Sequence, residues 1–350
     1  AMNLMVKALD TLRGKGVEIT EEEKEAAILG ILMHDIGHGP YSHTLEYTLA
    51  QGVNHEDISI MLMERMNIEF GGALRLAIDI FRGDYHKKPF LHQLISGELD
   101  MDRLDYLNRD SFYSGVSEGI IGSDRLIEML QVHEGNLVIE EKGIYSIEKF
   151  LIARRLMYWQ VYLHKTVIAG EQLLIKILER ARELALDGKI LFATPSLAHF
   201  LNNIIKQEDF LDNPIHLERF ALLDDHDIFT SIKVWAEDSD LILSTLCKHL
   251  IYRNLYQVEI SNQAPELHVI TQMVEKAKTV YHVSEDDATY FVFTDTIKNS
   301  AYRPGDGSIQ ILMKDGSVVD IAQASDNSNL EALAKTVKKY IFCYLKELVN

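Results

Sequence analysis

Apolar residues recur at helical spacing through most of the first 250 residues, and this periodicity limits the possible fold more than any other feature of the sequence. Two such stripes open the chain, the first made by Leu4, Met5, Ala8, Leu9 and Leu12 and the second by Ala26, Ala27, Ile28, Ile31 and Leu32. Steps of three and four residues place each set on one face of a helix. Thr20 and Glu23 form the pattern of a capping box before the second stripe. The sequence therefore predicts amphipathic helices around a shared core.

The second helix is expected to end at His34-Asp35, because Gly37, Gly39 and Pro40 follow. Further helices are predicted over 44–51, 55–66, 73–82, 98–109 and 196–252, and a long helix over 146–186. Alternation around Lys142-Gly143 predicts a short hairpin within 136–147.

The pattern changes after Tyr252. Strand-like alternation is expected over 254–260, 290–295 and 308–322, with a turn at Asp315-Gly316. Helices are expected over 266–278 and 329–348. The predicted fold is mainly α, with a helical core at 1–185, a helical extension at 186–253 and a small C-terminal α+β subdomain at 254–350.

The charge and composition exclude several function classes. The 350 residues carry a formal net charge of −18, which repels a nucleic-acid backbone, and no basic run offsets it. No apolar run approaches the roughly 18 residues that span a bilayer, so no membrane partner is expected. The opening residues do not resemble a signal peptide, and there are only two cysteines. A cytoplasmic protein without a disulfide framework is therefore expected.

The segment MHDIGHGPYSH, residues 33–43, is the most informative stretch for chemistry. It places three histidines and an aspartate at the glycine-rich exit of a predicted helix. Adjacent helical residues diverge by about 100°, so His34 and Asp35 can share one ion only where the helix ends. Imidazole and carboxylate together suit several divalent metals, so the ligands do not select one. A second His-Asp pair, His226-Asp227, lacks a glycine exit and nearby histidines, and we expect it to play no part.

Two further segments carry charged and aromatic residues at helical spacing. In ELDMDRLDYLNRD, residues 98–110, apolar neighbours flank Asp102 and argue against a simply solvated carboxylate. In RRLMYWQVYLHK, residues 154–165, a helix would align Arg154, Tyr158, Tyr162 and Lys165. Cations can hold phosphate oxygens and an aromatic ring can stack on a base. A salt-bridged surface helix and a core-packed amphipathic helix are the plainer alternatives. His55-Glu56, which opens another helix, suits an imidazole oriented by a carboxylate for proton transfer.

Taken together, HDIGHGPYSH, NHE, LDMDRLDYLNRD and RRLMYWQVYLHK resemble the deoxynucleoside triphosphate triphosphohydrolases of the HD-domain superfamily. The motif-bearing resemblance covers roughly residues 1–170 and loosens toward residue 255. It implies an HD-domain helical core, a divalent metal ion (Mg, Mn, Zn, Fe, Co or Ni), and conversion of a dNTP to a deoxynucleoside and triphosphate. It also implies a homo-oligomer, often a tetramer, and leaves room for a nucleotide effector.

The resemblance assigns roles by position. The metal ligands would be His34, Asp35 and Asp102. The residues around the scissile phosphate would be His43, His55 and Glu56. Phosphate contacts would come from Arg103, Arg154 and Lys165, sugar contacts from Tyr106 and Asp110, and a base contact from Tyr162, with Tyr158 beside it.

One motif of the family, an Arg-x-x-His-Ser segment that carries an upstream metal-ligand histidine, is absent from this sequence. The chain opens at AMNLMVKAL, which resembles the helix that follows that segment. We expect that the numbering starts inside a longer protein. Two alternatives to a dNTP triphosphohydrolase remain open. One is an HD phosphohydrolase that acts on a monophosphate, a cyclic nucleotide or an alarmone. The other is a non-catalytic nucleotide-binding regulator.

Overall fold

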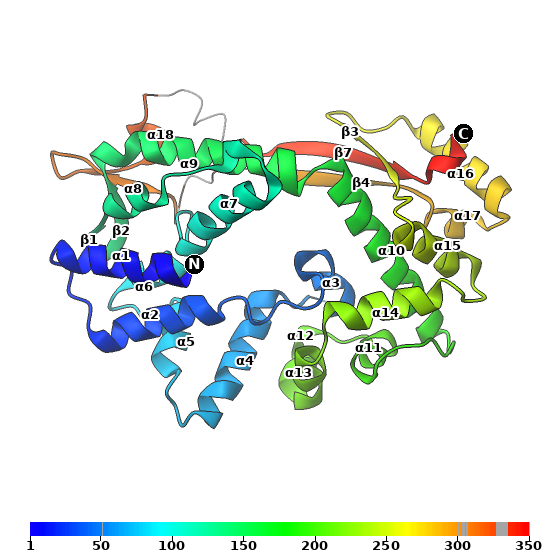
Figure 1. The fold of residues 1–350 in the computed structure, drawn as a ribbon, viewed down its shortest axis with the longest axis horizontal. Coiled ribbons are helices and arrows are strands. Elements are labelled where there is room, and N and C mark those ends of the chain that lie inside the picture. The colour runs from blue at the N-terminus through cyan, green and yellow to red at the C-terminus, as the bar shows by residue number, and fades with distance from the viewer. Residues whose placement is uncertain (51, 300–301, 303–304, 306, 327–334, 350) are drawn as a thin grey trace. The chain divides into compact units, whose positions relative to one another are not determined.

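The protein is mainly helical, as predicted, and its chain divides into two compact units (Figure 1). The computed structural model describes residues 1–50, 52–299, 302, 305, 307–326 and 335–349, apart from the side chain of Tyr47. Unit 1 comprises Ala1–Ile36, Ser59–Tyr162 and Asn299–Val337, and unit 2 comprises Gly37–Ile58, Leu163–Lys298 and Lys338–Asn350. The chain therefore passes repeatedly between the units, which differs from the three consecutive domains predicted at 1–185, 186–253 and 254–350.

Unit 1 is built on helices whose apolar faces form one core. They are α1 (Met2–Gly14), α2 (Glu21–Met33), most of α4 (His55–Glu69), α5 (Arg75–Arg82), α6 (Pro89–Ile95), α7 (Met101–Ser114), α8 (Ser123–Glu128) and α9 (Ile144–Met157). The predicted stripes of α1 and α2 are confirmed in large part, because Met5, Leu9 and Ala27 are fully buried. The capping box is also confirmed: the Glu23 backbone N–H donates to Thr20 Oγ1 and the Thr20 N–H donates to the Glu23 carboxylate.

A four-stranded sheet, in the order β1-β2-β5-β6, completes unit 1. Its strands are β1 (Leu130–His133), β2 (Asn136–Glu140), β5 (Gln310–Leu312) and β6 (Val318–Asp320). The turn at Asp315-Gly316 is confirmed. The hairpin predicted at Lys142-Gly143 is wrong: the chain turns at Glu134-Gly135, both with positive φ, and residues 141–143 form a short 3-10 helix. Glycine supports the left-handed backbone of such a turn, and the earlier of the two glycines has that role.

Unit 2 contains a helical part and a three-stranded sheet, in the order β3-β7-β4. Its helices are α3 (Glu46–Leu49), α10 (Lys165–Leu186), α11 (Pro195–Leu201), α12 (Gln207–Asp212), α13 (Pro214–Ala221), α14 (Asp225–Trp235), α15 (Leu241–Ile251), α16 (Leu267–Tyr281) and α17 (Glu285–Ala288). The strands are β3 (Gln257–Ser261), β4 (Val292–Asn299) and β7 (Val337–Tyr344). Even α10, with 22 residues, is not apolar enough to cross a bilayer, and the same holds for every helix in the described part of the chain.

Two predicted helices need correction. The helix expected over 146–186 is interrupted: α9 ends at Met157, a π-helical turn covers Tyr158–Tyr162, and α10 starts at Lys165. The helix expected over 329–348 is wrong where it can be compared, since Val337–Tyr344 is the strand β7, whereas residues 327–334 lie outside the described residues. Four consecutive buried residues, Ile341 to Tyr344, suit a strand covered on both faces better than a one-sided helix.

Candidate metal centre and histidine cluster

Unit 1 brings together the three predicted metal ligands. His34 caps the C-terminus of α2, Asp35 follows it, and Asp102 lies in the first turn of α7. His34 Nε2 is 3.2 Å from Asp35 Oδ1 and 3.6 Å from Asp102 Oδ1. One ligand atom from each residue lies within 4.8 Å of the others. The end of α2 before Gly37 is what lets two adjacent side chains converge.

The hydrogen bond made by the His34 ring determines which of its nitrogens faces the two carboxylates. Its Nδ1 is 2.7 Å from the Ile31 carbonyl oxygen, which can only accept, so Nδ1 carries the proton. In the neutral ring Nε2 then presents a lone pair, and this buried atom has no hydrogen-bond partner in the described structure. Burial lowers the pKa of His34, but the Asp102 and Asp35 carboxylates outweigh it and the net pKa is raised. Three electron-pair donors that converge in this way suit a proton or, better, a divalent metal ion.

Two arginines that were predicted to contact phosphate donate hydrogen bonds to residues of the loop before α7. The Arg103 guanidinium donates to the Asp100 carboxylate and to the Gly97 carbonyl. Arg154 is buried and donates to Glu98 Oε2 at 2.6 Å, while its buried Nε has no partner among the described residues. Glu98 and Asp100 were not predicted as site residues, although both lie in the motif that contains Asp102. Their carboxylates fix the directions of the two guanidinium groups.

Four predicted substrate contacts form an aromatic group in unit 1. Tyr162 Oη donates to Asp110 Oδ2 at 2.7 Å. The ring centroid of Tyr162 lies 6.2 Å from that of Tyr106 and 5.3 Å from that of Tyr158. Burial, and then Asp110, raise the pKa of Tyr162, so its hydroxyl stays protonated and donates. Tyr158 and Tyr162 lie on the π-helical turn, a distortion that is frequent at functional sites. Lys165, the remaining predicted contact, is the exposed first residue of α10 in unit 2.

Unit 2 contains a cluster of three histidines, His38, His43 and His55, here called the histidine cluster. The rings of His38 and His55 are stacked, with centroids 4.1 Å apart and planes 10° apart. His43 meets both rings edge-on, at 4.7 and 5.2 Å. The three residues have ligand atoms close enough for a metal ion. However, the lone pair of an imidazole nitrogen lies in the ring plane, so two parallel stacked rings do not converge on one ion. The arrangement favours proton transfer or anion binding.

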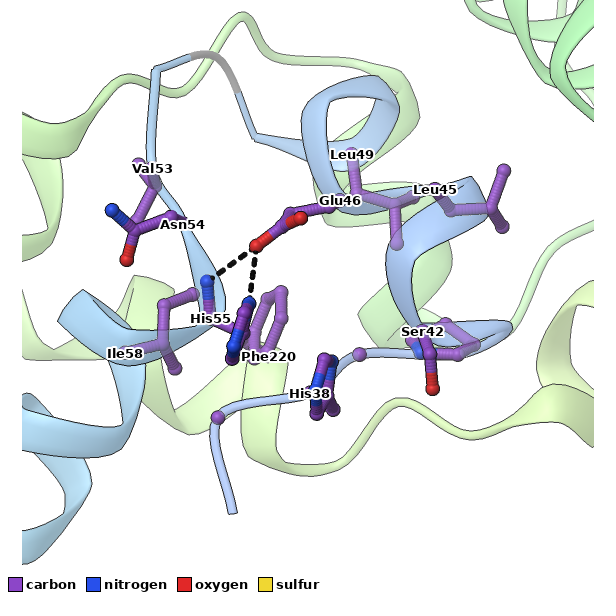
Figure 2. A pocket seen from close by; sticks show the side chains of 13 residues that line it. His38, Ser42, Leu45, Glu46, Leu49, Val53, Asn54, His55, Ile58 and Phe220 are labelled. Atoms are coloured by element: carbon purple, nitrogen blue, oxygen red, sulfur yellow. Dashed lines mark hydrogen bonds and ion pairs between the residues drawn. The ribbon is translucent and has the colours of Figure 1, made fainter. Parts of the chain in front are cut away.

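Glu46 anchors the histidine cluster, as Figure 2 shows. Glu46 Oε1 accepts from the His55 backbone N–H at 2.7 Å and from His55 Nδ1 at 2.6 Å, and Glu46 Oε2 lies 3.6 Å from His43 Nδ1. The predicted partner of His55 was Glu56, which is exposed and points elsewhere because adjacent helical residues diverge. The structure therefore places Glu46, not Glu56, in the orienting position. The spacing of Glu46 three residues after His43 was the signal that could have identified it.

The His226-Asp227 pair stays apart from both groups, as expected. The two residues lie in the first turn of α14, where Asp224 accepts from both backbone N–H groups. The His226 side chain is 92% exposed. Neither residue belongs to a group of potential metal ligands in the described chain.

Comparisons with known proteins agree with these motifs. The sequence matches the HD domain over residues 2–110 and an HD-associated region over residues 121–193. It is similar to YwfO of Bacillus subtilis, a protein named as uncharacterized, with 30% identity over 90% of this chain and 72% of that protein. A crystal structure of a phosphohydrolase from Bacteroides thetaiotaomicron has 54% identity and a TM-score of 0.92, over 98% of this chain and 85% of that one. The SAMHD1 homolog of Dictyostelium discoideum, named a deoxynucleoside triphosphate triphosphohydrolase, is 29% identical over 43% of this chain and 32% of its own length.

Proposed function

Because the chain belongs to the HD-domain phosphohydrolase family, we propose that it hydrolyses a dNTP to a deoxynucleoside and triphosphate. The observation that carries the proposal is in unit 1. There the buried Nε2 lone pair of His34 faces the carboxylates of Asp35 and Asp102, and two anchored arginines and the tyrosine group belong to the same unit. These are the parts that a charged polyphosphate, a sugar and a base require.

In this proposal His34, Asp35 and Asp102 hold the metal ion. A divalent cation bound there would lower the pKa of a water molecule and neutralise charge that develops on phosphate oxygens. Arg103 and Arg154 bind the remaining phosphate charge. Arg154 is suited to this because its bond to Glu98 fixes the direction of the guanidinium. A guanidinium has five N–H donors, so it can hold a carboxylate and a phosphate together.

The sugar and base contacts fall to the tyrosine group and Asp110. Asp110 is fixed by the Tyr162 hydroxyl, and its remaining acceptor positions suit a sugar hydroxyl. The faces of Tyr158 and Tyr162 offer stacking surfaces for a base. The homo-oligomer and the nucleotide effector implied by the family resemblance stay predictions.

Proton transfer is assigned to His43 and His55. The Nδ1 proton of His55 is held by Glu46, so its Nε2 carries the lone pair that can accept a proton. Glu46 has the role of an orienting carboxylate, since it bonds both the backbone and the ring of His55.

A substrate screen with the full chain tests the proposal. The four dNTPs, the four rNTPs, dNMPs, a cyclic nucleotide and an alarmone are incubated with Mg, Mn or Co, and triphosphate is measured separately from monophosphate. Triphosphate release from dNTPs is the expected result. Phosphate release from monophosphates alone, or cleavage of the cyclic nucleotide or alarmone alone, would assign the enzyme to another substrate. Full metal occupancy without hydrolysis of any nucleotide would favour a regulator.

Replacement of Lys165 by alanine should act mainly on substrate binding. A lysine that contacts phosphate equally in the ground state and the transition state raises KM when removed, with kcat nearly unchanged. A hydrogen bond to a charged group corresponds to a change in KM of about tenfold to a hundredfold. Steady-state kinetics with the preferred nucleotide measure this, with Lys149→Ala, an exposed lysine of α9, as the control. A fall in kcat at constant KM would contradict a simple binding role.

The pH dependence of kcat should have its acidic limb below pH 6.5. Partial desolvation of the ring, and then the neighbouring His38 and His55, lower the pKa of His43 from its ordinary 6.5, although its side chain is 71% exposed. His43 is therefore neutral and able to accept a proton at pH 7, and it becomes protonated as the pH falls through this lowered pKa. The measurement is kcat against pH with metal content determined at each point. The limb should vanish in His43→Ala, whereas a limb centred above 6.5 would contradict the assignment.

A further inference from the structure

The histidine cluster lies on a segment, residues 37–58, whose backbone departs from the usual conformations just before His43. Tyr41 and Ser42 are consecutive non-glycine residues with φ of 53° and 44°. Side chains of L residues rarely adopt this left-handed region, and a bulky residue such as tyrosine does so least readily. A conformation of this kind persists only where the surroundings impose it. The surroundings of residues 39–42 in unit 2 therefore bear on where His43 lies.

One such contact comes from α14. The backbone N–H of Tyr41 donates to Asp225 Oδ1 at 2.8 Å, across 184 residues of sequence. Asp225 is the first residue of α14, and the capping residue before it is Asp224. Because Asp224 caps α14, the Asp225 carboxylate is available to accept a hydrogen bond from the segment of residues 37–58. This hydrogen bond fixes the orientation of the peptide group that joins Pro40 to Tyr41, directly before the two residues with positive φ.

A second contact comes from α13. A Cβ atom built on Gly39 would lie 2.9 Å from the Phe220 ring, which is closer than real Cβ contacts. Phe220 is itself buried and packed among Phe200 and Phe210, with ring centroids 6.0 and 6.2 Å away, which limits the movement of its ring. It lines the same pocket as His38 and His55 (Figure 2). A Cβ atom at position 39 would therefore fit only if the Phe220 ring shifted.

We propose that Asp225 and Phe220 are positioning residues that hold the histidine cluster in its working arrangement. They act through the backbone at Tyr41 and Gly39, and neither is assigned a contact with substrate. Without the bond to Asp225, residues 41 and 42 are expected to relax to negative φ and to move the His43 imidazole away from Glu46. The inference rests on the proposed function for its kinetic readout, because it concerns the two histidines assigned to proton transfer.

Substitutions at Asp225 test the first contact in the full, metal-loaded chain. Asp225→Ala should lower kcat about tenfold with KM nearly unchanged, because a displaced catalytic group costs rate more than binding. Asp225→Asn keeps an oxygen acceptor and should restore most of the rate. The matched control is Asp227→Ala, which removes a capping bond from the same turn of α14 without touching the segment. Equal losses in Asp225→Ala and Asp227→Ala, or no recovery with asparagine, would overturn the role of Asp225.

A compensating pair tests the second contact. Gly39→Ala should lower kcat because its methyl group meets the Phe220 ring, and Gly39→Ala/Phe220→Leu should recover, because leucine leaves space where the ring stood. Thermal denaturation of each variant separates loss of rate from loss of folding. A double variant no more active than Gly39→Ala would show that the Phe220 contact does not position the segment.

A readout without substrate separates this inference from the proposed function. The histidine ring signals of the full chain, followed by NMR against pH and assigned with His43→Ala, report the surroundings of His43 whether or not nucleotides are hydrolysed. Asp225→Ala should shift the His43 titration and Asp225→Asn should return it toward that of the wild type. If the wild-type protein hydrolyses no nucleotide but the variants show these changes in the His43 titration, the proposed function alone is refuted. An unchanged His43 titration in Asp225→Ala would refute the positioning role alone.

Discussion

Asp102→Ala should abolish metal retention and turnover together, with a loss of kcat of at least about 10³-fold. Asp102 supplies one of two carboxylates that face the His34 Nε2 lone pair. Of the three proposed ligands, its removal leaves the adjacent His34 and Asp35. A cation site that loses a charged ligand loses affinity as well as geometry. Metal analysis after dialysis and kcat on the same preparation measure the two effects.

Asp105→Ala is the matched control for this variant. Asp105 lies one turn along α7, pairs with Arg109 at 2.8 Å and belongs to neither group of potential metal ligands in the described chain. It should keep both metal and activity. An Asp102→Ala protein that retains its metal would remove Asp102 from the ligand set. Activity that returns to Asp102→Ala at high metal concentration would instead show a weakened site and support the assignment.

His55→Ala should lower kcat by roughly 10²–10⁴-fold while the metal content stays unchanged. Proton transfer by a positioned imidazole contributes a factor of this size. His55 is suited to it because Glu46 holds its Nδ1 proton and so fixes which nitrogen is basic. The metal should be retained because none of the three proposed ligands is altered. His86→Ala, at an exposed histidine, is the control.

The outcome also separates the two candidate histidines. If kcat is unchanged in His55→Ala, that residue has no part in the chemistry and His43 becomes the better candidate. If metal content falls with kcat, the histidine cluster contributes to metal binding in a way that the parallel His38 and His55 rings do not suggest.

Glu46→Gln should lose part of the rate, since an amide oxygen still accepts a hydrogen bond but does not stabilise a charged imidazole.

The convergence of His34, Asp35 and Asp102 could be predicted from sequence because it depends on local rules. The glycines after Asp35 end α2, and the apolar neighbours of Asp102 direct α7 toward the core. The hydrogen-bond partners of the charged side chains could not be predicted from sequence. Glu46 reaches His55 across nine residues and Glu98 reaches Arg154 across 56, and such contacts depend on tertiary packing. Glu56 was chosen in place of Glu46 because adjacency in sequence was taken for proximity in space.

The same limit explains the errors in the fold. The β7 segment was predicted as a helix, whereas its place between β3 and β4 gives it the partners of a strand. The β5-β6 pair was predicted as part of a C-terminal subdomain, but β5 pairs with β2, about 170 residues earlier in the chain. A pairing between segments so far apart in the sequence produces no periodic pattern in either of them. The residue pattern of a strand does not show which other strand it pairs with.

The place of β7 in its sheet has a consequence for how the protein is made. The middle strand of β3-β7-β4 is the last of the three to leave the ribosome, so β3 and β4 wait with unpaired edges until residue 344 has been synthesised. Unit 2 therefore cannot complete its sheet until Val337–Tyr344 has been translated. Such long-range closure is slow and leaves exposed strand edges open to aggregation. A nascent chain stalled before Val337 should consequently be protease-sensitive in β3 and β4 and bind chaperones that recognise extended apolar segments.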